Sequence, residues 1–301
     1  MDQQIEFILQ LVPAWHGLDA TIIPLVGGIT NQNYRVDIGD EQFVVRIGGK
    51  DTRLLGIDRE RERTCTAVVA RLGIGAEVIY AHSSDTAEVL VTRFLPGITL
   101  SPVEVAQPET LQRIVEVLQR YHAGPAFPGT FSPFETVRSY YQLALDKGVS
   151  FPEILPQVFS QMEQIETALR PVCQLRPCHN DLLASNFIDN GHSMHIIDWE
   201  YAGMGDLFFD LGNLAANQEL DREQCELLLH AYFGELRSVD SAHLYLMRLA
   251  SDLRESFWGF LQQGISTIDF NYQEYADHHL QRFLRNVSTP LFADCLREIH
   301  L

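Results

Sequence analysis

Short apolar segments separated by turn signals fill the first third of the chain, which is the pattern of a small antiparallel sheet. Two of these segments flank residues 39–40 and two more flank the polar stretch 83–87, so each pair predicts a hairpin. Between the pairs, Asp58 can cap a helix that Gly73 can end. We therefore expect one inserted helix and five strands, near residues 21–26, 33–38, 41–47, 76–82 and 88–94.

The pattern changes at residues 94–102, where two prolines and a glycine suit a hinge between two lobes, 1–95 and 96–301. Beyond the hinge, apolar residues recur with the period of helices. In the segment 108–124 one stripe gathers Leu111, Ile114, Val115, Leu118 and Tyr121. Further helices are expected near residues 136–147, 156–170, 221–233, 240–263 and 272–286.

One short β-hairpin is expected inside this helical region. Two apolar runs flank the sequence NGHSM, so the chain should turn near residues 191–193. The predicted register pairs Ile188 with Ile196, which would anchor the hairpin in the core. It also pairs Asn186 with Asp198, which would face each other at the open end.

Composition and charge exclude several classes of protein. The 301 residues carry a formal net charge of -18, whereas a nucleic-acid binder usually has a basic balance, so we expect no nucleic-acid partner. No apolar run approaches the roughly 18 residues that a membrane span needs. The acidic start, without a basic residue before Arg35, predicts neither a secretory signal nor a transit peptide. Five scattered cysteines without a CxxC pair favour reduced thiols, so we expect a cytoplasmic protein.

The hairpin brings together side chains that suit metal chemistry. Asn186 and Asp198 offer two oxygen ligands for Mg²⁺, which takes few protein ligands and keeps waters and phosphates. Asp181, on the loop before the hairpin, is placed to act as a base. Protein kinases arrange a base, a metal Asn and a metal Asp at this spacing. The alternative is that these residues are only caps and turn residues.

A phosphate-binding region is expected in the first lobe. The turn at 27–33 has two glycines that permit close approach to a phosphate, although a plain hairpin turn is an alternative. Its candidate phosphate contacts are Gly28, Thr30 and Asn31. The chain has only two lysines, and strand alternation points Arg46 away from its apolar neighbours. Arg46 is therefore the expected phosphate-binding cation.

The chain resembles the choline/ethanolamine kinase family, within the wider group of aminoglycoside phosphotransferases. The resemblance covers nearly the whole chain and depends on the motifs GGITNQNYRV, FVVRIGG, IDRERE, TRFLPG, HNDLLASN, IDWEYAG, FFDLGN and WGFLQQGISTIDFNYQEYA. It implies an α+β, two-lobed, protein-kinase-like fold, with a small antiparallel-sheet lobe carrying one inserted helix. A mainly helical second lobe would carry the catalytic β-hairpin.

The same resemblance implies ATP as the phosphate donor and assigns further residues. Glu62, on the inserted helix, would orient Arg46, although a solvated charge on a helix face is an alternative. The backbone near Phe94 and Leu95 would meet the adenine. Asp210, in the motif FFDLGN, is expected to cap a helix and support the catalytic loop.

The implied acceptor is a small cationic alcohol such as choline or ethanolamine. Aromatic faces and an acid bind such a cation, and the candidates are Tyr201, Trp258, Tyr272 and Tyr275. The sequence does not separate the last two tyrosines, and each of these aromatic residues could instead belong to the core. Thiamine or an aminoglycoside remains an alternative acceptor. The alternative from another class is a nucleotide-binding regulatory protein without turnover. The oligomeric state is left open.

Overall fold

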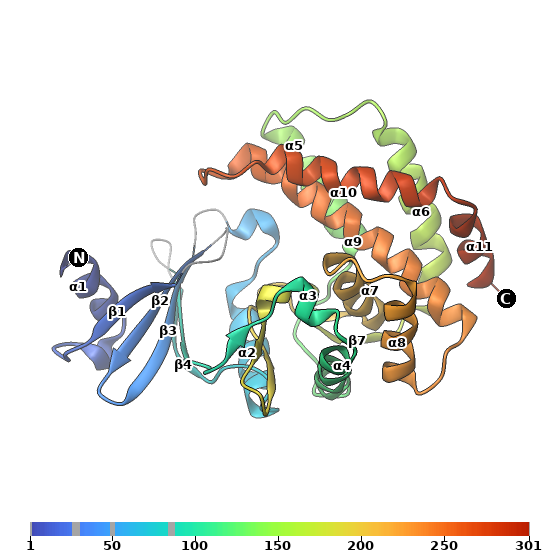
Figure 1. Ribbon diagram of the computed structural model, residues 1–301. Helices are drawn as coiled ribbons and strands as arrows, with labels where there is room; N and C mark the ends of the chain where they lie inside the picture. The colour runs from blue at the N-terminus through green and yellow to red at the C-terminus, as the bar shows by residue number, and fades with distance from the viewer. Residues whose placement is uncertain (1, 26–30, 49–51, 84–87, 301) are drawn as a thin grey trace.

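Two lobes joined at residues 94–97 make up the structure, a computed structural model that describes residues 2–25, 31–48, 52–83 and 88–300 (Figure 1). The first lobe is built on an antiparallel sheet and the second is mainly helical. The expected α+β, two-lobed, protein-kinase-like architecture is therefore confirmed. The positions of the boundaries between the lobes, 95 and 96, remain a prediction.

The first lobe contains the five predicted strands and the inserted helix. The strands are β1 (Thr21–Leu25), β2 (Asn31–Ile38), β3 (Glu41–Gly48), β4 (Val78–Ser83) and β5 (Glu88–Arg93). They pair in the order β1-β2-β3-β5-β4, and every pairing is antiparallel. Helix α2 (Arg59–Arg71) begins as predicted, because the Asp58 side chain accepts hydrogen bonds from the backbone of Glu60 and Arg61, both at 3.0 Å.

A further helix, α1 (Asp2–Leu11), had no counterpart among the predicted elements. It leads into a short 3-10 turn, Pro13–Trp15, and the two together cover the sheet. The buried side chains of Ile8 and Trp15 join the core of this lobe, and the Trp15 ring lies 5.0 Å from that of Phe43. The first segment of the chain therefore closes one face of the sheet.

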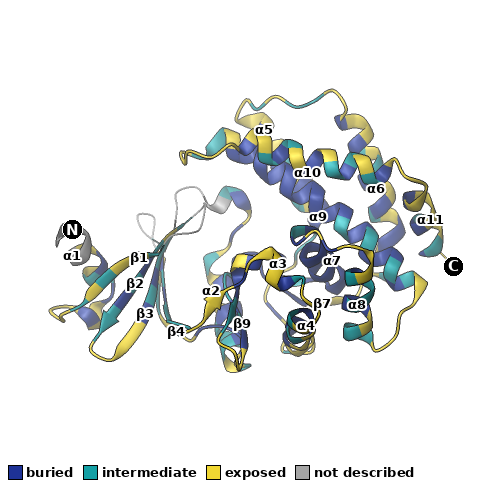
Figure 2. Ribbon diagram, in the orientation of Figure 1, coloured by how far each residue is buried: buried dark blue, intermediate teal, exposed yellow. Residues whose placement is uncertain are grey.

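The second lobe is organised around α9 (Ser238–Ile265), which is buried along most of its length and is packed against α5, α7 and α10 (Figure 2). The other helices are α3 (Pro102–Val105), α4 (Pro108–His122), α5 (Pro133–Asp146), α6 (Leu155–Leu169), α7 (Leu207–Asn217), α8 (Arg222–Phe233), α10 (Tyr272–Val287) and α11 (Pro290–Glu298). The predicted stripe of α4 is buried. No range was predicted for α3, α7 or α11. Two short strands, β7 (Leu175–Cys178) and β10 (Gly203–Asp206), form an antiparallel pair.

The predicted hairpin is present, but its predicted register is wrong by one residue. Strand β8 (Phe187–Asp189) pairs with β9 (Met194–Ile196) so that Phe187, not Ile188, lies opposite Ile196. The cause is Asn190, whose side chain accepts a hydrogen bond from the backbone of Ser193 at 2.7 Å and so belongs to the turn. A shift of one residue reverses the faces of a strand. Phe187 is consequently in the core, and Ile188 faces the cavity described below.

Two separate apolar cores stabilise the molecule. A small one lies between the sheet and α1, and a large one fills the helical lobe. Cys65 and Val69 of α2 belong to the large core, so α2 connects the sheet lobe firmly to the helices. Among the residues that the structure describes, no helix is both long enough and apolar enough to cross a membrane.

Candidate active site

A cavity of about 600 Å³ lies between the lobes. Its wall comes from β3, β5, α2, the linker at 94–97, the hairpin region, α9 and α10. Of the residues singled out from the sequence, the wall contains Arg46, Glu62, Phe94, Leu95, Asp181, Asn186, Asp198, Tyr201, Trp258 and Tyr275. Gly28 and Thr30 lie outside the described residues. The fold thus gathers one set of candidates from segments far apart in sequence.

The catalytic-loop candidates are held by the backbone of the hairpin. The Asn186 side chain donates from Nδ2 to the carbonyl oxygen of Asp181 at 2.9 Å. The Ile197 backbone donates to the carbonyl of Asn186 at 3.0 Å, so Ile197, and not Asp198, is the backbone partner of Asn186. Asp198 follows with φ +65°, a conformation that is uncommon for a residue other than glycine. This backbone turn, rather than the predicted cross-strand pairing, places Asp198 on the wall shared with Asn186.

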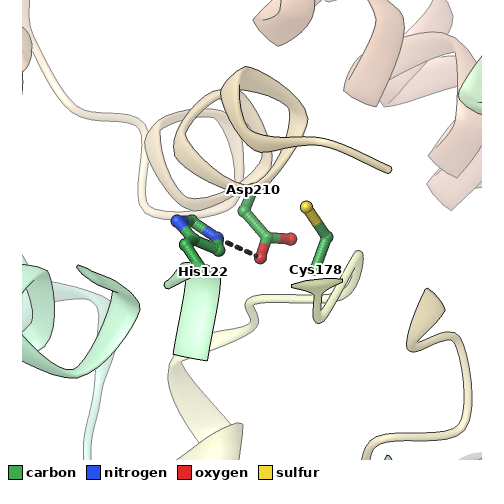
Figure 3. Close-up of side chains that lie close together, drawn as sticks. All are labelled: His122, Cys178 and Asp210. Carbon is green, nitrogen blue, oxygen red and sulfur yellow. Dashed lines mark hydrogen bonds and ion pairs between the residues drawn. The ribbon is translucent and has the colours of Figure 1, made fainter. Parts of the chain in front are cut away.

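A buried hydrogen-bond network fixes the loop that carries Asp181. The Asp210 carboxylate accepts from the backbone of His179 at 2.8 Å and of Asn180 at 2.7 Å. It also accepts from Tyr121 Oη at 2.6 Å and contacts His122 Nε2 at 3.1 Å, as Figure 3 shows for His122. The expected support of the catalytic loop by Asp210 is therefore present.

The expectation that Asp210 caps a helix is wrong, because the N-cap of α7 is Asp206 and Asp210 lies in the first turn. Cys178 lies beside His122 and Asp210 in the same cluster (Figure 3). Each of the Asp210 oxygens already accepts hydrogen bonds from the protein. We therefore interpret this cluster as a brace and not as a metal site.

His179 braces the loop from inside, as expected. Its Nε2 lies 2.9 Å from the carbonyl oxygen of Ile197, and its Nδ1 accepts from the Asp181 backbone at 3.1 Å. Burial lowers the pKa of His179, which favours the neutral ring that these two contacts require. The ring therefore connects the loop of Asp181 to the strand end that precedes Asp198.

Arg46 lies at one end of the cavity between two carboxylates. It forms an ion pair with Glu62, as the family resemblance implies, and its Nη1 lies 2.8 Å from Asp198 Oδ1. The Glu62 side chain is 2% exposed, whereas that of Glu60 is 83% exposed, so the inserted helix presents Glu62 and not Glu60 to the site. We call the region around Arg46, Glu62 and Asp198 the phosphate end of the cavity.

Three carboxylates converge at the phosphate end. Oxygen atoms of Glu62, Asp198 and Glu200 lie within 4.8 Å of one another, next to the guanidinium groups of Arg46 and Arg59. Burial raises the pKa of Glu200, and the charge of Asp198 adds to this effect. Glu62 and Glu200 are paired with Arg46 and Arg59, whereas Asp198 shares the cavity wall with Asn186. A carboxylate and an amide oxygen of this kind are ligands that Mg²⁺ accepts. The residues present therefore fit a magnesium ion.

The predicted turn at 27–33 is wrong at its end, because β2 already begins at Asn31, and of the turn candidates only Asn31 is described. Asn31 donates from Nδ2 to Glu200 at 3.3 Å and accepts from Arg59 Nη2 at 3.2 Å. It therefore reaches the phosphate end through Glu200. At the linker, the Phe94 backbone donates to the carbonyl of Gln42 at 2.9 Å, and Phe94 and Leu95 both line the cavity.

Asp181 lies at the other end of the cavity, which we call the acceptor end. Its Oδ1 accepts from Arg254 Nη1 at 3.0 Å, and the same nitrogen contacts Glu255. Burial raises the pKa of Asp181 to about 7, even though the charge of Arg254 opposes that rise. A carboxylate with a pKa in this range suits general-base catalysis near neutral pH.

Aromatic side chains surround Asp181. Tyr201 and Trp258 line the cavity with Tyr275, whose hydroxyl donates to Glu255 Oε2 at 2.7 Å. Tyr272 is not part of the wall formed by the described residues. It packs against Trp258 and bonds Ser266 at 2.8 Å. Of the two tyrosines that the sequence left open, Tyr275 is the one with access to the cavity.

Four residues of the site did not appear among the candidates chosen from the sequence, namely Arg59, Glu200, Arg254 and Glu255. The sequence contains a signal for each of two pairs, Glu200 with Arg59 and Arg254 with Glu255. Glu200 is two residues after Asp198, and Arg59 is three residues before Glu62 on the same helix. Arg254 and Glu255 are adjacent charges just before the apolar stretch 257–261 of α9, and burying such charges without a function is costly.

Comparison with known proteins places these features in context. Residues 21–242 match a family described as the phosphotransferase enzyme family. The chain is 33% identical over 232 residues to protein LicA of Haemophilus influenzae, and the match covers 73% of this chain and 66% of LicA. It is 26% identical over 319 residues to ethanolamine kinase 1 of Mus musculus, covering 91% of this chain and 86% of the relative.

Solved structures of similar proteins have the same fold. A choline/ethanolamine kinase family protein from Mesorhizobium loti superposes with a TM-score of 0.84 at 29% identity, covering 99% of this chain and 98% of that one. The choline kinase LicA from Streptococcus pneumoniae superposes with a TM-score of 0.78 at 24% identity, covering 95% of this chain and 99% of that one. The second likeness shows a shared fold.

Proposed function

This chain belongs to the phosphotransferase enzyme family and resembles its choline/ethanolamine kinases, and from this premise we propose an ATP-dependent kinase of small amino alcohols. The enzyme transfers the γ-phosphate of ATP to the hydroxyl of an acceptor of the choline or ethanolamine type. The observation that carries the proposal is the cavity of about 600 Å³ between the lobes. Its wall contains a base candidate, oxygen ligands for a cation, a phosphate-binding arginine and an aromatic, acidic end.

Asp181 accepts the proton of the acceptor hydroxyl in this mechanism. Arg254 holds Oδ1 of Asp181, which leaves Oδ2 for the hydroxyl. The Asp210 network and His179 fix the loop, so the carboxylate is in position before the acceptor binds. Positioning of this kind is the main protein contribution to phosphoryl transfer.

The phosphates of ATP bind at the phosphate end. Arg46, oriented by Glu62, binds them, and Asn186 and Asp198 hold Mg²⁺. When bound, the metal ion neutralises charge on the phosphate oxygens. Nδ2 of Asn186 is used by the Asp181 carbonyl, so its Oδ1 is the atom available to the metal. Gly28, Thr30 and Asn31 cover the phosphates, and the backbone at Phe94 and Leu95 meets the adenine.

The acceptor binds between Asp181 and the side chains of Tyr201, Trp258 and Tyr275. The cationic group lies against the Glu255 carboxylate, with the aromatic side chains of this end beside it. The hydroxyl then points to Asp181, toward the phosphate end. Tyr272 supports Trp258 from behind, with ring centroids 5.8 Å apart.

An ADP-release assay coupled to a reporter enzyme tests the proposal over choline, ethanolamine, thiamine and aminoglycosides, with a control that lacks acceptor. We expect acceptor-dependent ADP release with an amino alcohol. Preference for thiamine or an aminoglycoside would contradict the acceptor class. Binding of Mg·ATP without ADP release across the panel would contradict the proposed activity and favour a nucleotide-binding regulatory role.

A further inference from the structure

The acceptor end of the cavity already contains a cation, the side chain of Arg254. The residue is 2% exposed and comes from the middle of α9. Its Nη1 contacts carboxylates on two sides, Asp181 at 3.0 Å and Glu255. Its guanidinium carbon lies 4.4 Å from the centre of the Tyr201 ring, which is cation–π geometry. Arg254 therefore occupies one of the aromatic faces next to the base.

The other rings of the acceptor end are engaged with one another. Trp258 packs edge to face with Tyr275, with centroids 5.5 Å apart and planes at 69°. It packs similarly with Tyr272, at 5.8 Å and 67°. A trimethylammonium group has no N–H donor and depends on several open aromatic faces. Arg254 covers one aromatic face, and other rings pack against one another. The described residues therefore offer few open aromatic faces to a trimethylammonium group.

A carboxylate is available at the same place. Burial tends to raise the pKa of Glu255, but the charges of Arg254 and His279 and the Tyr275 hydrogen bond together lower it, so the group is ionised. One oxygen contacts Arg254, and the other accepts from the Tyr275 hydroxyl at 2.7 Å. A carboxylate oxygen can accept more than one hydrogen bond. Glu255 can therefore receive a further donor from a ligand.

The charge balance at this end favours a cation despite Arg254. Glu255 is ionised and Asp181, with a pKa of about 7, carries part of a negative charge near neutral pH, so together they exceed the single guanidinium of Arg254 that contacts both of them. A primary ammonium offers three N–H donors, and hydrogen bonds between charged groups are the strong ones. This pocket can therefore bind an ammonium group through hydrogen bonds to Glu255, but it does not form an aromatic cage.

We propose that Arg254 and Glu255 determine acceptor specificity, with Glu255 binding a protonated amine that carries N–H and Arg254 covering the aromatic face that a trimethylammonium group needs. The inference rests on the proposed kinase activity and names the acceptor class within it, an ethanolamine-type alcohol. The loss of the last N–H is the decisive chemical change. A hydrogen bond between charged groups corresponds to about 10- to 100-fold in kcat/KM.

The test measures kcat/KM for ethanolamine and its N-methyl, N,N-dimethyl and N,N,N-trimethyl derivatives with the unmodified protein. We expect the largest single decrease, about 10- to 100-fold, between the dimethyl and trimethyl compounds, because only that step removes the final N–H. A flat series, or a preference for the trimethyl compound, would overturn the inference. This measurement requires no variant to fold.

Glu255→Gln and Arg254→Met sharpen the result. The first should raise KM for ethanolamine about 10-fold with a smaller change in kcat, and leave the trimethyl compound little changed. The second uncovers the Tyr201 ring and should improve the trimethyl compound relative to ethanolamine. Glu274→Gln, at an exposed position in the first turn of α10, is the matched control and should leave the ratio unchanged. Circular dichroism checks that each variant is folded.

The outcomes separate the two proposals. Absence of turnover with all four alcohols would contradict the proposed function and the inference together. Turnover of amino alcohols with the same ethanolamine preference in folded Glu255→Gln as in the unmodified protein would overturn the inference alone.

Discussion

Each end of the cavity contains an arginine between two carboxylates, but the two arginines differ in what they connect. Arg46 reaches from β3 to Glu62 on α2 and to Asp198 after the hairpin, so its partners come from separate parts of the fold. Arg254 contacts its own neighbour in sequence and the loop of Asp181. The side chain of Arg46 is 12% exposed and that of Arg254 is 2% exposed.

This difference indicates different tasks. The more accessible arginine suits a highly charged, hydrated ligand such as a nucleotide phosphate, which arrives with a metal ion. The enclosed arginine has no room for such a ligand and instead shapes the environment of the base. The same arrangement of charges therefore binds phosphate at one end of the cavity and limits the choice of acceptor at the other.

Removal of the base at the acceptor end should have the largest effect. Asp181→Ala is expected to lower kcat by roughly 10²–10⁴, because the side chain takes the hydroxyl proton in the transition state. Nucleotide binding, measured by calorimetry, should change little since the side chain of Asp181 is bound by Arg254 and the phosphates are bound by Arg46. Near-normal turnover by this variant would show that another group is the base.

Removal of the arginine at the phosphate end should have the second largest effect. Arg46→Ala is expected to lower kcat by roughly 10²–10³, as for the loss of a preorganised charge on a transferring phosphoryl group, and to raise KM for ATP. Arg46→Lys should recover part of the loss. Arg63→Ala is the control, because Arg63 is half exposed on α2 and lies outside the cavity wall. Equal effects of the two alanine variants would contradict the assignment of Arg46.

The support beneath the acceptor end should affect stability. Asp210→Asn replaces one of the two carboxylate oxygens by an NH2 donor, so part of the buried hydrogen bonding that holds the loop of Asp181 is lost. The free energy of unfolding should fall by about 3 kcal/mol, measured by urea denaturation. An unchanged unfolding midpoint would mean that the network does not hold the loop.

The contribution of Asp210 should also depend on pH. Burial alone would raise the pKa of Asp210, but the hydrogen bonds and charges of its neighbours, chiefly His122, lower it overall. A carboxyl with a lowered pKa stabilises the folded state above its unfolded pKa of about 3.9, and that stability is lost as the pH falls through the folded value. The difference in unfolding free energy between the natural protein and Asp210→Asn should therefore narrow in acid. A difference independent of pH would contradict this assignment of the charge.

The smallest effect is expected from the residue that orients Arg46. Glu62→Gln keeps the shape of the side chain but removes its charge, so Arg46 retains Asp198 as a partner. A loss of about 10-fold in kcat/KM for ATP is expected, as for other groups that act through a ligand-binding residue. If Glu62→Gln were as damaging as Arg46→Ala, Glu62 would have to contact the nucleotide or its metal directly.

The sequence identified Arg46 and Glu62 at the phosphate end but missed Arg254 and Glu255 at the acceptor end, for physical reasons. Arg46 lies on a strand whose alternation shows which way each side chain points, whereas Glu62 was selected on its helix by the family resemblance. Arg254 and Glu255 lie on a helix buried on nearly every side, so periodicity does not reveal which side faces a cavity.

The register of the hairpin was also beyond what the sequence pattern could predict. Its existence follows from two apolar runs around a turn, but its register depends on whether Asn190 joins the strand or the turn. The side-chain hydrogen bond of Asn190 decided this and moved Ile188 to the cavity wall. The choice between Tyr272 and Tyr275 likewise required the packing of α10 against α9.

Direct identification of the product tests the central claim best. Phosphorus NMR of a reaction containing Mg·ATP and ethanolamine should show one new phosphomonoester signal that grows in step with ADP, and Asp181→Ala should nearly abolish it. ADP accompanied only by inorganic phosphate, or no reaction with any amino alcohol, would contradict the account.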